Sequence, residues 1–126
     1  MIVDTCVWIE FFRGPESDVA RALRGQLMER RVVMVRMVLA EILQGIRNVK
    51  EAQAVKEALG RLPCLEITRE MWEKAGDLSA SLRKRGKTIP LSDLVIAAAA
   101  LSAGHEVFTV APHFGEIEGM RLHAAP

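Results

Sequence analysis

The chain has 126 residues, 50% of them hydrophobic and 26% charged, which is ordinary composition for a globular protein. This length suits a single domain, residues 1–126, that buries a core of its own. The formal net charge of +1 excludes a general electrostatic attraction to nucleic acids or membranes, so any such binding must depend on a local patch.

The first half of the chain alternates between short apolar runs and amphipathic segments. One apolar run, at residues 1–3, ends abruptly at Asp4, and β-branched residues fill another at 31–35. Segments with apolar residues at helical spacing follow each of these runs. The predicted order is a strand at 1–3, helices at 7–12 and 16–30, a strand at 31–35, and helices at 38–46 and 50–62.

The second half continues this alternation. Thr68 is a natural cap for the next helix, Gly86 fits the left-handed residue that commonly closes it, and Gly104 ends the helix after that. Ser92 and Asp93 open a helix that is apolar on nearly every side, so we expect it to be buried. The predicted order is a strand at 64–67, a helix at 69–85, an extended segment at 89–91, a helix at 94–103, a strand at 106–110, a turn or short helix at 112–116, and an edge strand at 119–122.

This pattern predicts an α/β fold, namely a three-layer α/β/α sandwich with a central, mostly parallel sheet of four to five strands. Right-handed crossovers would place the first strand in the middle of the sheet. Ligands of such folds bind beyond the carboxyl ends of the strands, where the strand order reverses. Asp4 directly follows the first strand and therefore marks the expected site.

The longest apolar run, residues 94–101, is far shorter than the ~20 residues that a membrane span requires. The first predicted strand begins at Met1, so we expect no signal peptide and a cytoplasmic location. Cys6 and Cys64 form no metal-binding spacing and lie in apolar contexts. We expect both to be buried, reduced thiols.

Three acidic residues follow or lie near the ends of predicted strands: Asp4, Glu41 and Asp93. Each has an ordinary alternative, because Asp4 suits a turn or a helix cap, Glu41 a solvent-exposed helix face, and Asp93 a helix N-terminus. Gly45 lies one turn after Glu41, which suggests that a backbone or a ligand approaches closely there.

Together the three acids are more informative than any one alone. Two carboxylates about 4 Å apart repel each other by roughly 4 kcal/mol at an effective dielectric constant near 20, so an ionised cluster needs a cation. Carboxylate oxygens suit Mg²⁺ or Mn²⁺ rather than zinc. The pattern favours metal-dependent hydrolysis of a phosphodiester.

Three segments of the sequence resemble motifs of the PIN-domain family, and more closely those of VapC-type toxin ribonucleases from prokaryotic toxin–antitoxin pairs. They are Ile2–Ile9, Leu39–Gly45 and Gly86–Ala98, which contain Asp4, Glu41 and Asp93 respectively. The resemblance implies a PIN-like fold, a Mg²⁺- or Mn²⁺-dependent endoribonuclease, a homodimer and inhibition by a VapB-type antitoxin. It also implies that these three acids are the catalytic and metal-binding residues.

The chain departs from the family pattern near its end. The family reads Thr-x-Asp-x-x-Phe, and here Thr109 and Phe114 match while Ala111 stands in place of the acid. One alternative is therefore a catalytically weakened or inactive domain that binds an antitoxin or RNA. Glu116 or Glu118 could substitute for the missing acid. His113 could contact the scissile phosphate, or be an ordinary loop histidine.

We assign supporting positions around the acids to Thr5, Ser92 and Thr109. The Thr5 hydroxyl would hold an acid or a metal-bound water, or else make a local backbone hydrogen bond. RNA-binding candidates come from the one dense basic cluster, Arg83, Lys84, Arg85 and Lys87. These cations could equally be solvated charges that complement the helix dipole.

Partner surfaces could form from the exposed part of residues 8–12 and the apolar faces of the helices between residues 50 and 85, which would bind a second subunit or an antitoxin helix. A receiver-like signalling domain is a further alternative, but this chain lacks the acidic pair that such a domain carries after its first strand.

Overall fold

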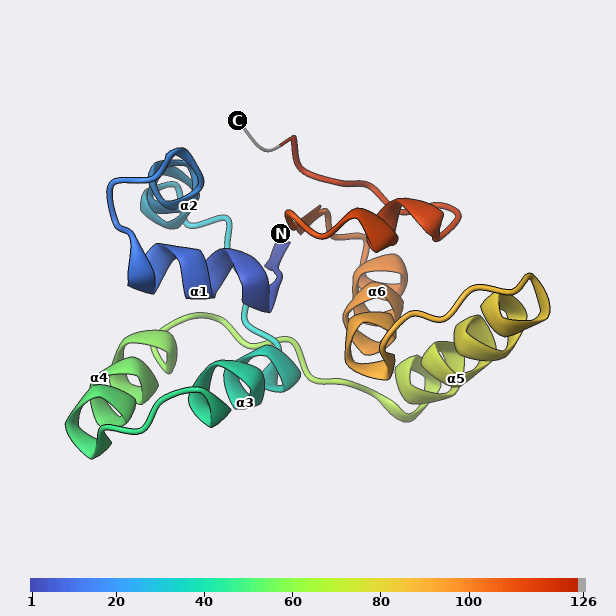
Figure 1. Cartoon of the computed structure of the whole chain (residues 1–126), viewed down its shortest axis with the longest axis horizontal. Helices are drawn as coiled ribbons and strands as arrows, with labels where there is room; N and C mark the ends of the chain where they lie inside the picture. Colours follow the sequence, from blue (N-terminus) through green and yellow to red (C-terminus); the bar gives the residue numbers. More distant parts are fainter. Residues whose placement is uncertain (125–126) are drawn as a thin grey trace.

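The structure is a computed structural model that describes residues 1–124. Figure 1 shows the course of the chain through six α-helices, two short strands and one 3₁₀ helix. The elements are β1 (Ile2–Val3), α1 (Thr5–Arg13), α2 (Asp18–Met28), α3 (Arg36–Gln44), α4 (Val49–Leu59), α5 (Arg69–Lys84), α6 (Leu91–Ala103), β2 (Val107–Phe108) and η1 (Pro112–Glu116). No helix among the described residues is long and apolar enough to cross a membrane.

The six helices occur where apolar periodicity and capping residues predict them. The Ser17 hydroxyl accepts the Ala20 N–H at 3.0 Å at the start of α2, and the Thr68 hydroxyl accepts the Met71 N–H at 3.2 Å at the start of α5. Gly104 closes α6 with φ = 74°, a left-handed conformation that glycine adopts without a steric penalty. Local side-chain chemistry thus sets most helix boundaries.

Most helix boundaries differ by one to three residues from the sequence-based expectation, and two of these differences concern the candidate site. α6 begins at Leu91 with Pro90 at its N-cap, so Ser92 lies inside the first turn and does not cap the helix. α3 ends at Gln44, which leaves Gly45 as the residue after the helix rather than inside it. A Cβ atom on Gly45 would meet only the Ile42 carbonyl oxygen at 3.7 Å, so among the described residues no backbone from another element approaches closely there.

The sheet is smaller than predicted. β1 and β2 pair in parallel, with Ile2 opposite Val107 and Val3 opposite Phe108. The other expected strands contribute only isolated parallel bridges, which join Ile2 to Val33, Met34 to Cys64, and Val107 to Leu122. Within residues 1–124 a sheet of four to five strands is therefore not evident, although the bridges place β1 in the middle of these segments, as expected.

Local chemistry explains why the outer pairings stay short. Pro63 accepts a hydrogen bond from the Met34 N–H at 2.7 Å but has no N–H of its own to continue a ladder. Val35 is already the N-cap of α3, so the segment leaves the sheet after Met34. An apolar run predicts which residues are buried and does not predict how many of them pair.

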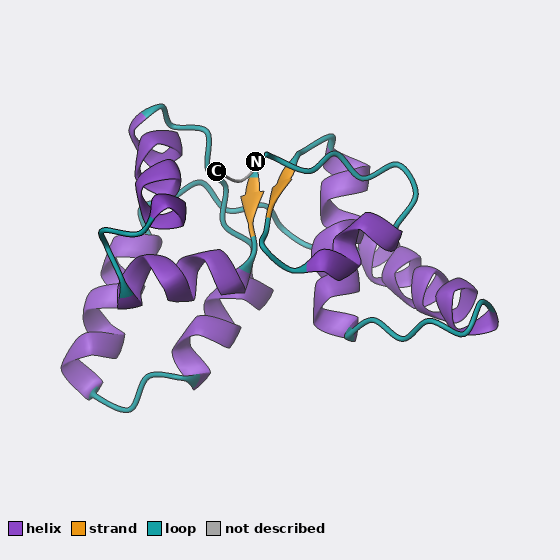
Figure 2. Cartoon of the chain, turned by 45° about the horizontal axis from the view of Figure 1, so that its top comes forward, coloured by secondary structure: helices purple, strands orange, loops and turns teal. Residues whose placement is uncertain are grey.

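Figure 2 shows the two strands between two groups of helices, with α1–α4 on one side and α5 and α6 on the other. α6 packs against α5 and also against α3, and every residue from Leu94 to Ala100 is buried. The small alanine side chains in this stretch allow close packing on both sides. Among the largest fully buried side chains are Trp8, Phe108 and Phe114, which fill the core around β1 and β2.

Candidate functional site

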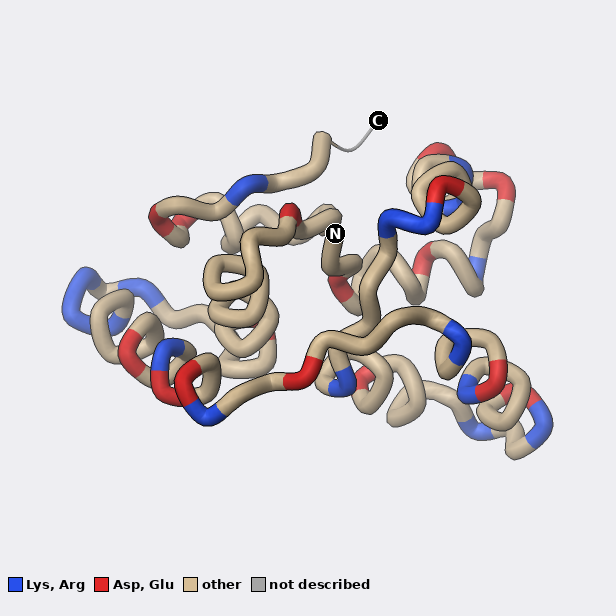
Figure 3. The backbone as a smooth tube through the Cα atoms, turned by 180° about the vertical axis from the view of Figure 1, so that it is seen from behind, with Lys and Arg blue, Asp and Glu red and all other residues tan. Residues whose placement is uncertain are grey.

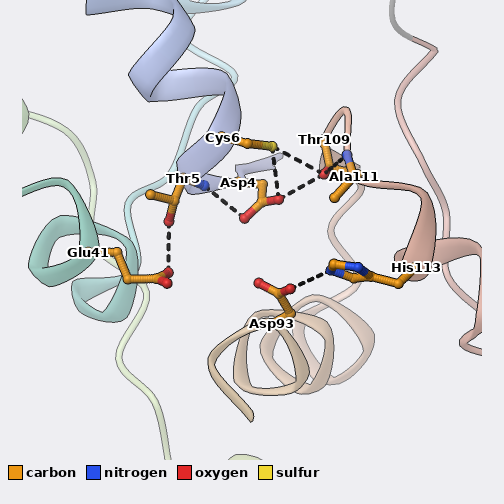
Figure 4. Close-up of polar contacts among 8 residues, drawn as sticks. All are labelled: Asp4, Thr5, Cys6, Glu41, Asp93, Thr109, Ala111 and His113. Atoms are coloured by element: carbon orange, nitrogen blue, oxygen red, sulfur yellow. Dashed lines mark hydrogen bonds and ion pairs between the residues drawn. The ribbon is translucent and has the colours of Figure 1, made fainter. Parts of the chain in front are cut away.

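The three acids come together beyond the carboxyl end of β1. Asp4 directly follows β1, Glu41 lies on α3, and Asp93 lies in the first turn of α6. Figure 4 shows their carboxylates turned toward a common space, from three different elements. Residues that are 37 and 52 positions apart along the chain thus become neighbours through the fold.

Asp4 is the most firmly held of the three. Its side chain is only 4% exposed, and its backbone N–H donates to the Phe108 carbonyl at 2.9 Å. The carboxylate accepts three hydrogen bonds, from the Thr5 N–H at 2.8 Å, the Thr109 hydroxyl at 2.8 Å and the Cys6 thiol at 3.2 Å. These donors compensate the carboxylate for the water it loses on burial.

Cys6 was expected to be a buried, reduced thiol; it is half-buried, and its contact with Asp4 was not predicted from the sequence. Burial raises the pKa of the Cys6 thiol, so the sulfur keeps its proton and acts as a donor. Cys6 lies two positions after Asp4, the cap of α1, so its side chain can turn back toward the cap. This spacing is visible in the sequence and could have predicted the contact. Cys64, also expected to be buried, is exposed beside the short pairing with Met34.

Glu41 is held through Thr5. The Thr5 hydroxyl donates to Glu41 Oε1 at 2.8 Å, while the Thr5 backbone N–H donates to Asp4. One residue therefore links two of the three carboxylates, and of the alternatives for Thr5 the structure has the hydroxyl bonded to an acid. Glu41 is half-buried on α3, so the solvent-exposed alternative does not describe it.

Asp93 is partly buried and faces the other two acids. Its side chain is 14% exposed, and burial, followed by the negative charges of Asp4 and Glu41, raises the pKa of Asp93. A hydrogen bond with His113 Nε2 opposes this rise. The charges of both other acids act on Asp93, which agrees with the placement of the three groups around one site.

The donor set suits a hard divalent cation. The site offers carboxylate oxygens and two threonine hydroxyls, and the mutual repulsion of the acids would fall if a cation lay between them. Within residues 1–124 no three histidine, cysteine or acidic side chains already form a compact ligand group. Asp93 instead bonds to His113, and Glu41 to Thr5.

The fourth acid of the expected pattern has no replacement in the structure. Ala111 presents a methyl group, and its backbone N–H donates to the Thr109 hydroxyl at 2.9 Å. Glu116 forms an exposed ion pair with Lys87, which lowers the pKa of Glu116. Glu118 lines a separate cavity beside Arg85. Neither glutamate therefore reaches the acids in this arrangement.

The basic cluster lies away from the acids. Arg83 and Lys84 end α5, and Figure 1 shows that end of the helix at the outer edge of the molecule, whereas the start of α6 lies near the middle. Lys87 is bonded to Glu116 rather than free. The basic cluster and Asp93 are thus close in the sequence but far apart in the structure.

Comparisons with known proteins show the family and the fold. The family model described as PIN domain matches residues 1–119. VapC ribonuclease Mb1587 of Mycobacterium bovis and Ribonuclease VapC11 of Mycobacterium tuberculosis are each 27% identical over 111 residues, covering 85% of this chain and 83% of the relative. The structure of VapBC2 from Rickettsia felis, bound to a DNA fragment from its promoter, is similar with a TM-score of 0.81 at 19% identity, covering 97% of this chain and 96% of that chain.

Proposed function

This chain belongs to the PIN-domain family, and on that basis we propose that it is a metal-dependent endoribonuclease, the toxin of a type II toxin–antitoxin pair. The observation that carries the proposal is the meeting of Asp4, Glu41 and Asp93 at one edge of the sheet. The relatives named as VapC ribonucleases support the reaction. The VapBC complex among the similar structures supports an antitoxin of the VapB type as the partner.

We assign Asp4, Glu41 and Asp93 as the catalytic residues that would hold Mg²⁺ or Mn²⁺. When bound, such an ion polarises a phosphoryl oxygen and lowers the pKa of a water molecule, which supplies the nucleophile. The chain's own residues keep the acids oriented for this task. Thr109 and Cys6 fix one oxygen of Asp4, and Thr5 fixes one oxygen of Glu41.

The missing acid at Ala111 favours a second candidate function, an inactive PIN domain that only binds RNA or an antitoxin. Its methyl group cannot hold a metal ion, and Glu116 is occupied by Lys87. The two candidates differ in one respect, which is whether three acids suffice for cleavage. Cleavage of RNA by the wild type separates them, because only the first candidate cuts RNA with alanine at position 111; Ala111→Asp should increase cleavage in either case.

A groove on the surface offers a place for the antitoxin. The cavity, about 320 Å³ in volume, lies between α1, α3 and α4. Its walls are mostly apolar, with one charge of each sign, and are formed by Ile9, Phe12, Arg13, Ile42, Gly45, Ile46, Glu51 and Val55. An amphipathic antitoxin helix would lay its apolar face in such a groove.

A second surface suits the homodimer that the family resemblance implies. Trp72 on α5 is 49% exposed, which is unusual for so large an aromatic side chain. It lines a smaller cavity together with Arg36, Met37, Leu65, Glu66 and Ile67. We assign this patch to a second copy of the chain, and analytical ultracentrifugation of Trp72→Glu would test the assignment.

The activity is tested by incubating the purified protein with RNA and Mn²⁺. We expect cleavage that EDTA abolishes and that Asp4→Asn or Asp93→Asn reduces by at least about 100-fold, because each substitution removes an anionic ligand. Asp77→Asn, on the exposed side of α5, is the matched control and should cleave like the wild type. Wild-type cleavage no faster than that of both active-site variants would instead support the inactive domain.

A further inference from the structure

His113 is the candidate whose contacts go furthest beyond the proposed set of acids. Its Nε2 bonds to Oδ2 of Asp93, and it is the only side chain recorded as hydrogen-bonded to Asp93 within residues 1–124. Asp4 has three donors and Glu41 has the Thr5 hydroxyl. Without His113, Asp93 would be the one acid that no neighbouring side chain holds in place.

The fold fixes the position of the imidazole. His113 lies in η1, between Pro112 at the start of that turn and Phe114, whose side chain is fully buried. The hydrogen bond from the Ala111 N–H to the Thr109 hydroxyl ties the preceding residue to the same threonine that holds Asp4. The imidazole itself is 34% exposed, and its ring centroid lies 5.5 Å from that of Phe114.

The contact also determines which nitrogen carries a proton. An ionised carboxylate only accepts hydrogen bonds, so His113 must donate from Nε2. A neutral imidazole protonated at Nε2 is sufficient, and no positive charge is required. Figure 4 shows His113 on one side of Asp93, Glu41 on the opposite side and Asp4 above it.

We propose that His113 is a positioning residue that holds Asp93 by one oxygen and leaves the other oxygen free to bind the divalent cation. The proposal rests on the proposed function, since it concerns the same three acids. Ala111 has no side chain that could hold Asp93 from this direction, so the hydrogen bond from His113 restrains an acid that the chain otherwise leaves unsupported. Partners that orient metal ligands in this way typically contribute 10- to 100-fold to metal affinity or activity.

The test uses three variants and a measurement that does not need RNA. His113→Ala removes the donor, and His113→Gln retains an N–H donor on a flexible chain. His123→Gln is the matched control, because His123 is a second histidine near a carboxylate, 3.8 Å from Glu106, at the opposite end of the sheet. Isothermal titration calorimetry gives the Mn²⁺ dissociation constant of each protein, and thermal unfolding confirms that each is folded.

We expect His113→Ala to weaken Mn²⁺ binding at least about tenfold, His113→Gln to recover most of the loss, and His123→Gln to bind like the wild type. In cleavage assays kcat should fall for His113→Ala while KM changes little. Nitrogen NMR of the metal-free protein should show His113 protonated at Nε2. Wild-type Mn²⁺ affinity in folded His113→Ala, or a proton on Nδ1 alone, would overturn the proposal.

These outcomes separate the two proposals. If the wild type binds Mn²⁺ but cleaves no RNA, and His113→Ala binds the ion more weakly, the role of His113 stands and the ribonuclease activity fails. If the wild type cleaves RNA and His113→Ala binds Mn²⁺ equally well, the activity stands and the role of His113 fails. If the wild type binds no Mn²⁺, both fail together.

Discussion

Asp4 and Asp93 carry the same functional group in two different environments. Asp4 caps α1 and accepts three hydrogen bonds, so its charge is well compensated although the side chain is nearly inaccessible. Asp93 has one partner, His113, and it faces two other negative charges. The cost of assembling the site therefore falls mainly on Asp93, which is typical of residues kept for function rather than stability.

This cost predicts that Asp93→Asn stabilises the metal-free protein. The raised pKa means that the folded state binds a proton more tightly than the unfolded state, whose Asp93 has the ordinary value of 3.8. Stability is therefore reduced at neutral pH and recovers as the pH falls through the raised pKa toward 3.8. We expect a Tm higher by a few degrees for Asp93→Asn at pH 7, measured by calorimetry in EDTA.

The pH dependence of the Tm difference shows whether the charge of Asp93 destabilises the folded protein. The difference in Tm between Asp93→Asn and the wild type should shrink as the pH is lowered, because the wild-type side chain also becomes neutral. A variant that is less stable than the wild type at pH 7 would show that the hydrogen bond with His113 outweighs the repulsion from Asp4 and Glu41.

Residue types were easier to predict than their contacts. A run that ends in an acid, or an acid that opens a buried helix, is visible in the sequence, and so Asp4 and Asp93 were predictable as candidates. The Cys6 thiol and the Ser92 hydroxyl show the limit. Cys6 contacts Asp4 because of its position within α1, and Ser92 does not cap α6 because that helix begins at Leu91.

At the scale of elements, helices were predictable and strands were only partly so. A helix is determined by contacts between residues three or four apart, which the sequence displays directly. A strand depends on its neighbour, and here Pro63 and the early start of α3 limit two expected strands to single bridges. The positions of the strand segments were therefore predictable, but the extent of their pairing was not.

The groove between α1, α3 and α4 leads to a prediction at this scale. Gly45 lines the groove in a right-handed conformation, with φ = −89°, that any residue adopts. We expect Gly45→Leu to place a side chain in the groove and to weaken binding of the cognate antitoxin at least about tenfold, a loss of 1.4 kcal/mol or more. Fluorescence anisotropy with labelled antitoxin measures the affinity.

The control is Gly76→Leu on α5, where an added Cβ meets no atom within 4 Å and the antitoxin groove is remote. Both variants should keep a Tm close to that of the wild type, because neither substitution creates a clash. Equal antitoxin affinity for Gly45→Leu and Gly76→Leu would place the antitoxin on another surface.

At the scale of the whole molecule, charge is unevenly distributed although the net charge is small. Figure 3 shows lysine and arginine gathered at the outer end of α5, whereas the acids of the site lie directly after β1, on α3 and in the first turn of α6. An RNA strand that reached both regions would need to cross part of the molecular surface. The basic cluster would then act as a distant anchor for the phosphate backbone and not as part of the cleavage site.

If the basic cluster anchors RNA, removing its charges should weaken RNA binding and leave the chemical step unchanged. Each phosphate contact on a single strand contributes about 0.7 to the slope of log affinity against log salt, so three lost contacts reduce the slope by about 2. The variant carries alanine in place of Arg83, Lys84 and Arg85. We expect KM for RNA to rise and kcat to stay nearly constant, as measured by cleavage kinetics at several salt concentrations.

A matched control removes the same amount of charge from another face. It carries alanine in place of three exposed cations on or just after α4, namely Lys50, Lys56 and Arg61. If both triple variants changed KM and the salt dependence equally, the effect would come from net charge, and the end of α5 would have no special role in holding RNA.

The central claim is that three acids distant in sequence bind one divalent cation. A crystal structure of the protein soaked with Mn²⁺ tests it most directly, because anomalous scattering locates the ion independently of any assay. The account predicts a peak with oxygen ligands from Asp4, Glu41 and Asp93. An ion bound elsewhere, or any of these carboxylates turned away from the ion, would contradict it.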